Sequence, residues 1–371
     1  MDMTLKSTQL PQRGFSLVEL LIAMTLGLIL IASMVAVFSG NKRSSELNAA
    51  TANLQESARY ALEQISRDAR IAGYMGCLTE PTAVNVIADT APSTDLLRTA
   101  VTGSVAVDSL AWSPALPGFP PPTTNPAKAG THVLLLQYAG PDSTKLTQKM
   151  PTPSANIQTL DDNGLALNDL AVISNCEFGS LFQISNIGGT GTGTVTEISH
   201  AAAANSNTGA FNRAYGDAKS IRETRVMKFN SNIYFIGANG EQNDSGQNLF
   251  SLYQQSLPYN SVNNPPVELV TGVENFRVTY GVSDNVTGGV RFVTADSPLF
   301  NPARVNSIRI GLLMVSYDEV AEIDDTNTYN LAGIPITPAT AANTGADTHP
   351  VDRRIRLAFT TTIQIRNRRN L

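Results

Sequence analysis

Residues 12–40 read QRGFSLVELLIAMTLGLILIASMVAVFSG, and this stretch decides how the chain is organised. From Leu20 to Phe38 no side chain is charged, so the run is long enough to cross the hydrocarbon core of a bilayer. Glu19 lies just inside the apolar run, where an unpaired carboxylate is costly. This carboxylate therefore needs a specific partner.

Three ordinary interpretations of the apolar run compete. A secretory signal has an apolar region of about 7–15 residues and then a small-residue cleavage site. Here the run is longer, and no clear A-x-A-like site follows Phe38. A plain signal anchor fits the length but leaves Glu19 unexplained. A buried core helix with so continuous an apolar surface would be unusual.

The charges that flank the run do not decide its orientation. Lys6 and Arg13 precede it, and Lys42 and Arg43 follow it, so the positive-inside bias is weak. Long downstream domains translocate largely regardless of flanking charge. We therefore expect the C-terminal part of the chain to be exported.

The string Gly14-Phe15-Ser16-Leu17-Val18-Glu19-Leu20, after a short polar leader, resembles a type IV prepilin signal. In that family a prepilin peptidase cuts after the glycine, on the cytoplasmic side, and methylates the new N-terminal residue. The resemblance implies a leader peptide at residues 1–14, cleavage after Gly14 and N-methylation of Phe15. It also makes Glu19 the fifth residue of the processed chain.

Cleavage explains why a carboxylate is kept at position 19. It would create a positive amine at Phe15, on a helix end with unsatisfied backbone N–H groups. Glu19 lies four residues on, so it shares a helix face with that amine. It can neutralise its own terminus, or that of a neighbouring subunit in a filament. We interpret Glu19 as an assembly residue; the alternative is a glutamate that snorkels at the membrane interface.

The helical pattern continues beyond Phe38 as one apolar stripe. Its members recur at spacings of three, four or seven residues: Leu47, Leu54, Ala58, Leu62, Ile65, Ala69 and Ala72. Gly73 and Gly76 follow the stripe and favour the end of the helix. We predict one helix over residues 15–76, membrane-spanning at about 15–38 and amphipathic beyond.

After Cys77 the apolar period changes from helical to two, which is typical of strands. The runs are residues 131–138, 169–175, 181–187, 193–199, 226–237, 249–257, 274–282, 306–318 and 354–368. The proline-containing region 81–126 and residues 324–350 read as loops. The sequence thus predicts an α+β protein, with a long N-terminal helix packed on an antiparallel β-rich head at residues 77–371.

Three closing runs, residues 267–282, 305–318 and 353–368, resemble the C-terminal half of the PilW family of minor pilins, which looks related to the J-type pseudopilins. The resemblance implies a minor pilin, not an enzyme, that takes part in type IV pilus assembly or initiation. Twitching motility, adhesion or DNA uptake would depend on that pilus. Implied partners are the prepilin peptidase, other minor pilins, the major pilin and a PilY-type tip adhesin. The implied location is the inner membrane, with a periplasmic head, and then the pilus at the cell surface.

The two cysteines, Cys77 and Cys176, can form a disulfide if the head is exported. Two separate buried thiols are the alternative. No cofactor or metal site is expected, because no histidine lies near a cysteine at metal-ligand spacing. The glycine-rich run 188–199 leads into a strand, and the acidic stretches 160–164 and 322–327 lack the full EF-hand register. We interpret all three as turns or loops.

A cluster of arginines marks the C-terminal end of the chain. It comprises Arg353, Arg354, Arg356, Arg366, Arg368 and Arg369. Such cations can bind nucleic-acid phosphates. The formal net charge of −5 and the regular strand alternation instead favour a solvated sheet edge with protective charges.

Two other functions stay open at this point. A J-type pseudopilin of a type II secretion system would be processed in the same way and serve a different machine. A membrane-tethered periplasmic enzyme or binding protein would keep an uncleaved anchor and build a cleft in its head. The scarcity of histidines and of catalytic motifs counts against the second.

Overall fold

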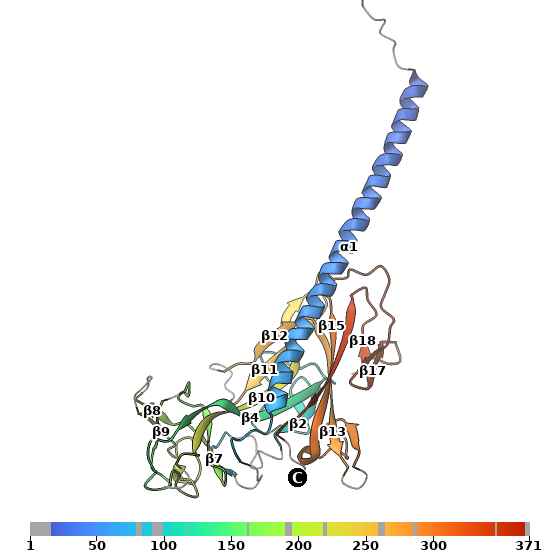
Figure 1. The fold of residues 1–371 in the computed structure, drawn as a ribbon. Coiled ribbons are helices and arrows are strands. Elements are labelled where there is room, and N and C mark those ends of the chain that lie inside the picture. Colours follow the sequence, from blue (N-terminus) through green and yellow to red (C-terminus); the bar gives the residue numbers. More distant parts are fainter. Residues whose placement is uncertain are drawn as a thin grey trace, which may run out of the picture. The chain divides into compact units, whose positions relative to one another are not determined.

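The computed structural model describes residues 16–78, 84–90, 99–116, 118–161, 163–189, 195–217, 221–258, 264–284, 288–345 and 347–367. Figure 1 shows one long helix, α1 (Leu17–Ile71), followed by a chain whose regular elements are mostly strands. The chain divides into two compact units, Met1–Ala50 and Thr51–Leu371, and α1 contributes to both. No proline interrupts α1, and Gly73 and Gly76 follow it with positive φ angles of 81° and 73°.

The largest sheet has nine strands within the described residues, in the order β1-β7-β6-β10-β4-β2-β3, with β11 on β10 and β12 on β11. All pairs are antiparallel except β1 with β7. The strands are β1 (Val84–Val86), β2 (Val101–Asp108), β3 (Ala111–Ser113), β4 (His132–Lys145), β6 (Leu170–Ser174), β7 (Gly179–Gln183), β10 (Arg225–Gln242), β11 (Asn248–Ser256) and β12 (Val267–Thr271).

A second, four-stranded antiparallel sheet has the order β14-β13-β15-β19 in the part of the chain that the structure describes. Its strands are β13 (Val273–Ser283), β14 (Val290–Val293), β15 (Val305–Val315) and β19 (Arg356–Gln364). Gly272 alone separates β12 from β13 and has a positive φ of 69°. A Cβ there would lie 2.7 Å from the carbonyl oxygen of Val315, so both the turn and the close approach favour glycine.

Two small three-stranded sheets complete the described strands. They comprise β5 (Ile157–Thr159), β8 (Asn186–Gly188) and β9 (Thr196–Ser199), and then β16 (Tyr329–Leu331), β17 (Ile334–Pro338) and β18 (Thr348–His349). Short 3-10 helices occur at η2 (Asn207–Gly209) and η3 (Pro302–Arg304).

Both regions predicted as loops contain strands, so those predictions are wrong in part. Strand β2 lies in the proline-containing region, and its pairing with β4 buries a run of small residues whose own pattern is weak. Strands β16, β17 and β18 lie in the region 324–350. Leu331 and Ile336 from that region pack on Leu313 of β15, and this contact holds the small sheet against the four-stranded sheet.

The C-terminal part of α1 packs against both larger sheets in one core. Leu54, Ala58 and Ile65 of the predicted stripe are buried, and they share a cluster with Tyr234 of β10 and Phe276 of β13. Alanines on the stripe allow the helix to lie close to the strands. The fold class predicted from the sequence, one long helix on an antiparallel-rich β head, is confirmed.

Candidate assembly site

The first turn of α1 places Glu19 at the helix start. The backbone N–H of Ser16 donates to Oε2 of Glu19 at 3.3 Å, and the N–H of Val18 donates to Oγ of Ser16 at 3.3 Å. Both contacts satisfy donors that an α-helix leaves open at its N-terminus. A carboxylate there also interacts favourably with the helix dipole. Gly14 and Phe15, the predicted processing residues, lie outside the described residues.

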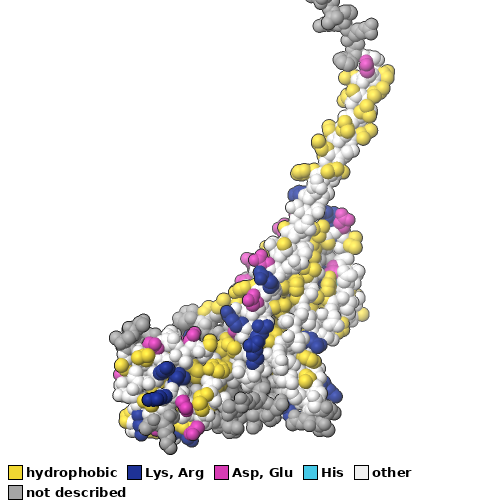
Figure 2. Space-filling model, in the orientation of Figure 1, with side chains coloured by type: hydrophobic (Ala, Val, Ile, Leu, Met, Phe, Trp, Pro, Cys, Tyr) yellow, Lys and Arg dark blue, Asp and Glu magenta, His cyan; other side chains and the backbone are white. Residues whose placement is uncertain are grey.

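The N-terminal part of α1 exposes apolar side chains along its length, and Figure 2 shows those on one face. The exposed large hydrophobic residues are Leu17, Val18, Leu20, Leu21, Ile22, Met24, Leu26, Leu28, Ile29, Leu30, Ile31, Met34, Val35, Val37 and Phe38. An 18-residue window of α1 has a mean hydropathy of 2.7, and none of it is buried. Such a surface requires a cover of lipid or of other protein.

Small residues interrupt this apolar surface at Ala23 and Gly27. A Cβ at Gly27 would meet nothing within 4 Å inside the chain. Packing within its own unit therefore does not require a glycine at this position. Close approach of another helix is the use that small residues serve in membranes.

Cys77 and Cys176 are joined by a disulfide, with their Cα atoms 4.7 Å apart. Cys77 lies just after α1, and Cys176 lies just after β6. The bond thus ties the end of the helix to the larger sheet.

The helix is also held to this sheet by one buried carboxylate. Asp68 is 3% exposed, and it accepts from the hydroxyl of Tyr234 at 2.6 Å and from Nδ2 of Asn232 at 3.0 Å. Burial, together with the charge of Asp68, raises the pKa of Tyr234, which keeps the hydroxyl as a donor. The sequence pattern missed Asp68, because it occupies a position that reads as the flank of an alanine-rich stripe.

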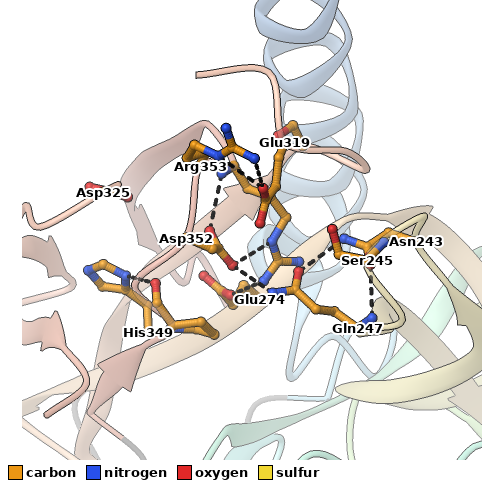
Figure 3. Close-up of polar contacts among 12 residues, drawn as sticks. Asn243, Ser245, Gln247, Glu274, Glu319, Asp325, His349, Asp352 and Arg353 are labelled. Atoms are coloured by element: carbon orange, nitrogen blue, oxygen red, sulfur yellow. Dashed lines mark hydrogen bonds and ion pairs between the residues drawn. The ribbon is translucent and has the colours of Figure 1, made fainter. Parts of the chain in front are cut away.

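A second group of buried charges lies where β13 and β19 begin. Arg356 donates from Nε to Glu274 at 2.6 Å and from Nη1 to Asp352 at 2.8 Å. Arg354 donates from Nε to Asp352 at 2.9 Å and from Nη2 to Glu274 at 3.2 Å. Asp325 accepts from Nη1 of Arg356 at 3.3 Å. We call these five residues the arginine cluster. Figure 3 shows two of its carboxylates, Glu274 and Asp352, close together beside the Arg353–Glu319 pair.

The pKa shifts in the arginine cluster agree with fully charged partners. Burial alone would raise the pKa of Asp352, but hydrogen bonds and charge from Arg356 and Arg354 outweigh it and lower that pKa. Burial likewise opposes the charge of Arg356, yet Glu274 and Asp352 raise its pKa. Every side chain of this cluster therefore has its partner inside the head.

Comparison with known proteins identifies the region that holds the arginine cluster. Residues 233–367 match the family model described as Type IV pilus-assembly protein W, or PilW. This region is a PilW domain. Residues 10–35 match the prokaryotic N-terminal methylation motif. These matches confirm the PilW resemblance and the prepilin-type N-terminus.

Two further comparisons complete the picture. A solved structure of a type IV-like pilin from Thermus thermophilus aligns with 85% of this chain and 96% of its own, at 12% identity and a TM-score of 0.30. No curated protein matches the sequence. The PilW domain points to a structural protein of type IV pilus assembly. The motif implies contact with a prepilin peptidase and other pilins, membrane anchoring and pilus association.

The expectation of a solvated arginine edge is wrong for two of its residues. Arg354 and Arg356 are both 4% exposed, so two of the six arginines are not available to solvent. They were misassigned because arginine in a strand pattern reads as a surface residue unless a buried carboxylate partner is known. Arg353 and Arg366 are exposed. Arg368 and Arg369 lie outside the described residues.

The three histidines are held by backbone groups. Nδ1 of His132 lies 2.9 Å from the carbonyl oxygen of Val278, Nε2 of His200 lies 3.0 Å from that of Ala155, and Nε2 of His349 lies 2.8 Å from that of Asn327. Within the described ranges, no group of three or more His, Cys, Asp or Glu side chains is placed to hold a metal ion. Part of each predicted turn, 160–164 and 188–199, lies outside those ranges.

Proposed function

We propose that this protein is a PilW-type minor pilin that takes part in the assembly or initiation of a type IV pilus. The observation that carries the proposal is the position of Glu19. It is a carboxylate in the first turn of α1, whose N-terminal part is apolar and exposed, and it lies inside a matched methylation motif. A charge in that setting is tolerable when a partner neutralises it.

The proposed mechanism follows from the geometry of the helix start. Removal of residues 1–14 frees an amine at Phe15, and Glu19 neutralises it while the subunit is in the inner membrane. During assembly, Glu19 pairs instead with the terminus of a neighbouring subunit, which sets the axial offset between the two. The apolar surface of α1 exchanges lipid for the helices of its neighbours. Before assembly, the head at residues 77–371 lies in the periplasm.

The PilW domain favours a pilus over the pseudopilus of a secretion system. Other minor pilins, the major pilin and a PilY-type tip adhesin are the proposed partners. Twitching motility, adhesion and DNA uptake would follow from the filament and not from chemistry in the head.

The N-terminal peptide mass of protein recovered from membranes and from sheared filaments tests this proposal. We expect a chain that starts at Phe15, carries one methyl group and occurs in both fractions. An intact Met1 terminus, in cells whose prepilin peptidase processes other pilins, would overturn the proposal. A processed chain that never enters the filament fraction would exclude the pilus and leave the pseudopilus.

A further inference from the structure

Strand β19 is an edge strand without the usual protection. It pairs with β15 over nine residues without a bulge, and within the described residues no strand pairs with its other edge. No charged residue or proline occurs from Leu357 to Gln364. Proteins normally protect such edges with charges, prolines, bulges or short strands, because unpaired backbone groups accept a further strand.

The other end strands of the two larger sheets differ from β19 in this respect. β14 has four residues and carries Arg291, and β12 has five residues and carries Glu268. β1 and β3 have three residues each. The long, regular and uncharged edge is therefore a local property of β19.

Beside this edge lies a groove of about 1010 Å³ between β19 and the C-terminal part of α1. Leu62 and Ile71 of α1 and Phe359 of β19 contribute apolar lining, and Tyr60 is 52% exposed there. The volume matches the upper end of the range for ligand sites. An added strand would pair with the backbone of β19 and place alternate side chains on this lining.

The edge groove, as we call it, is strongly basic. Four arginines line it, namely Arg59, Arg67, Arg70 and Arg366, against one acidic residue, Glu63. Among the described residues these four guanidinium groups form no ion pair, although the whole chain has a net charge of −5. Figure 2 shows Lys and Arg side chains gathered along the C-terminal part of α1 beside hydrophobic ones.

These features together select one kind of occupant. The arginines would attract either carboxylates or nucleic-acid phosphates. The open backbone edge and the apolar lining, however, complement a polypeptide strand and not a duplex. We propose that the edge groove binds an acidic extended segment of another pilus subunit, which adds to β19 as a further strand. This inference rests on the proposed function, since it names a contact between minor pilins or between a minor pilin and another subunit.

Photo-crosslinking in cells that assemble pili tests the inference with the full chain. A benzoyl-phenylalanine at Tyr60 would sit in the edge groove, and one at Tyr317, which is 49% exposed outside it, is the matched control. We expect the Tyr60 probe to crosslink to another pilus subunit, at a segment that mass spectrometry shows to be rich in Asp or Glu. The double variant Arg59→Glu/Arg67→Glu would place like charges opposite that segment, and we expect its crosslink yield to fall roughly fivefold or more. The double variant Arg59→Lys/Arg67→Lys keeps the positive charges and should preserve the yield.

Several outcomes would overturn the inference. One is a crosslink to nucleic acid, to lipid or to the apolar helix of a neighbour. Another is a protein crosslink whose yield does not respond to charge reversal, or one that the Tyr317 probe reproduces. Equal denaturation midpoints of the purified charge variants exclude unfolding as the cause of a lost crosslink. A terminus at Phe15 in protein from the sheared filaments of the same cells would show that the proposed function stands even where the edge groove fails.

Discussion

Glu19 and Glu274 are two carboxylates in apolar surroundings that are satisfied in opposite ways. Glu274 is 4% exposed and has two arginines within its own head. Glu19 is exposed, and it accepts from the backbone N–H of Ser16. The difference teaches that a charge whose partners are internal stabilises the fold, whereas a charge at an exposed apolar helix start can serve the contact with another chain that we propose.

Removal of Arg356 should give the largest loss of stability. Arg356→Ala would leave Glu274 and Asp352 buried without their main cation, and we expect a loss of about 3–5 kcal/mol in the free energy of unfolding. Chemical denaturation of the full chain in detergent micelles measures it. Arg353→Ala is the matched control, since Arg353 is 53% exposed in its pair with Glu319, and the pair should contribute about 0–1 kcal/mol. Equal losses for the two variants would contradict the internal role of the arginine cluster.

His132 is a buried titratable group that contacts the backbone, and burial should keep its ring uncharged. Burial, and then the charge of Arg277, lowers the pKa of His132 from 6.5 to about 4, so the ring is neutral when folded at neutral pH. The unfolded chain takes up a proton at His132 below about pH 6.5, and the folded chain does so only near pH 4. Stability should therefore be complete above pH 6.5 and fall by about 3 kcal/mol between these pH values.

The variant His132→Gln should remove this slope between pH 6.5 and 4. Loss of stability below about pH 4 has a separate origin, because the depressed pKa values of Asp325 and Asp352 stabilise the fold only while those groups stay ionised. An unchanged slope in the glutamine variant would assign the pH dependence to groups other than His132.

These internal charges also mark the limit of what the sequence could predict. The long apolar runs of β13, β15 and β19 and the stripe on α1 carry strong periodicity, so their elements and faces were predictable. The strands β2 and β16 were not, because their burial depends on partners far along the chain. Glu19 was identified by its place in a local motif.

Asp68 and Arg356 show why the internal polar contacts could not be found in the same way. Asp68 meets Tyr234 across 166 positions, and Arg356 meets Glu274 across 82. Neither spacing has a local pattern, so a charged residue in a helix or strand reads as solvent-facing until the tertiary structure supplies its partner. The edge groove depends on the same tertiary information.

The anchor of α1 on the larger sheet should have an intermediate effect. Asp68→Ala leaves the hydroxyl of Tyr234 and the amide of Asn232 without their acceptor, and we expect a loss of about 1–3 kcal/mol in the free energy of unfolding. Denaturation of the full chain measures it, with Glu63→Ala on the exposed face of α1 as the control. A control variant that destabilises as much as Asp68→Ala would show that the loss does not come from the buried contact.

Glu19→Ala should have the smallest effect on folding and the largest on assembly. Because the hydrogen bond of Glu19 lies within its own first helical turn, we expect the denaturation midpoint and the cleavage after Gly14 to be unchanged. The number of pili per cell should fall sharply, since the amine at Phe15 loses its partner in the filament. Glu19→Gln tests whether charge is required: the amide keeps the size and the acceptor oxygen but not the negative charge, so it should fail as the alanine variant does. Normal piliation in either variant would show that the filament does not need the Glu19 carboxylate. The proposed distinction between Glu19, with a partner in another chain, and Glu274, with partners in its own head, would then be lost.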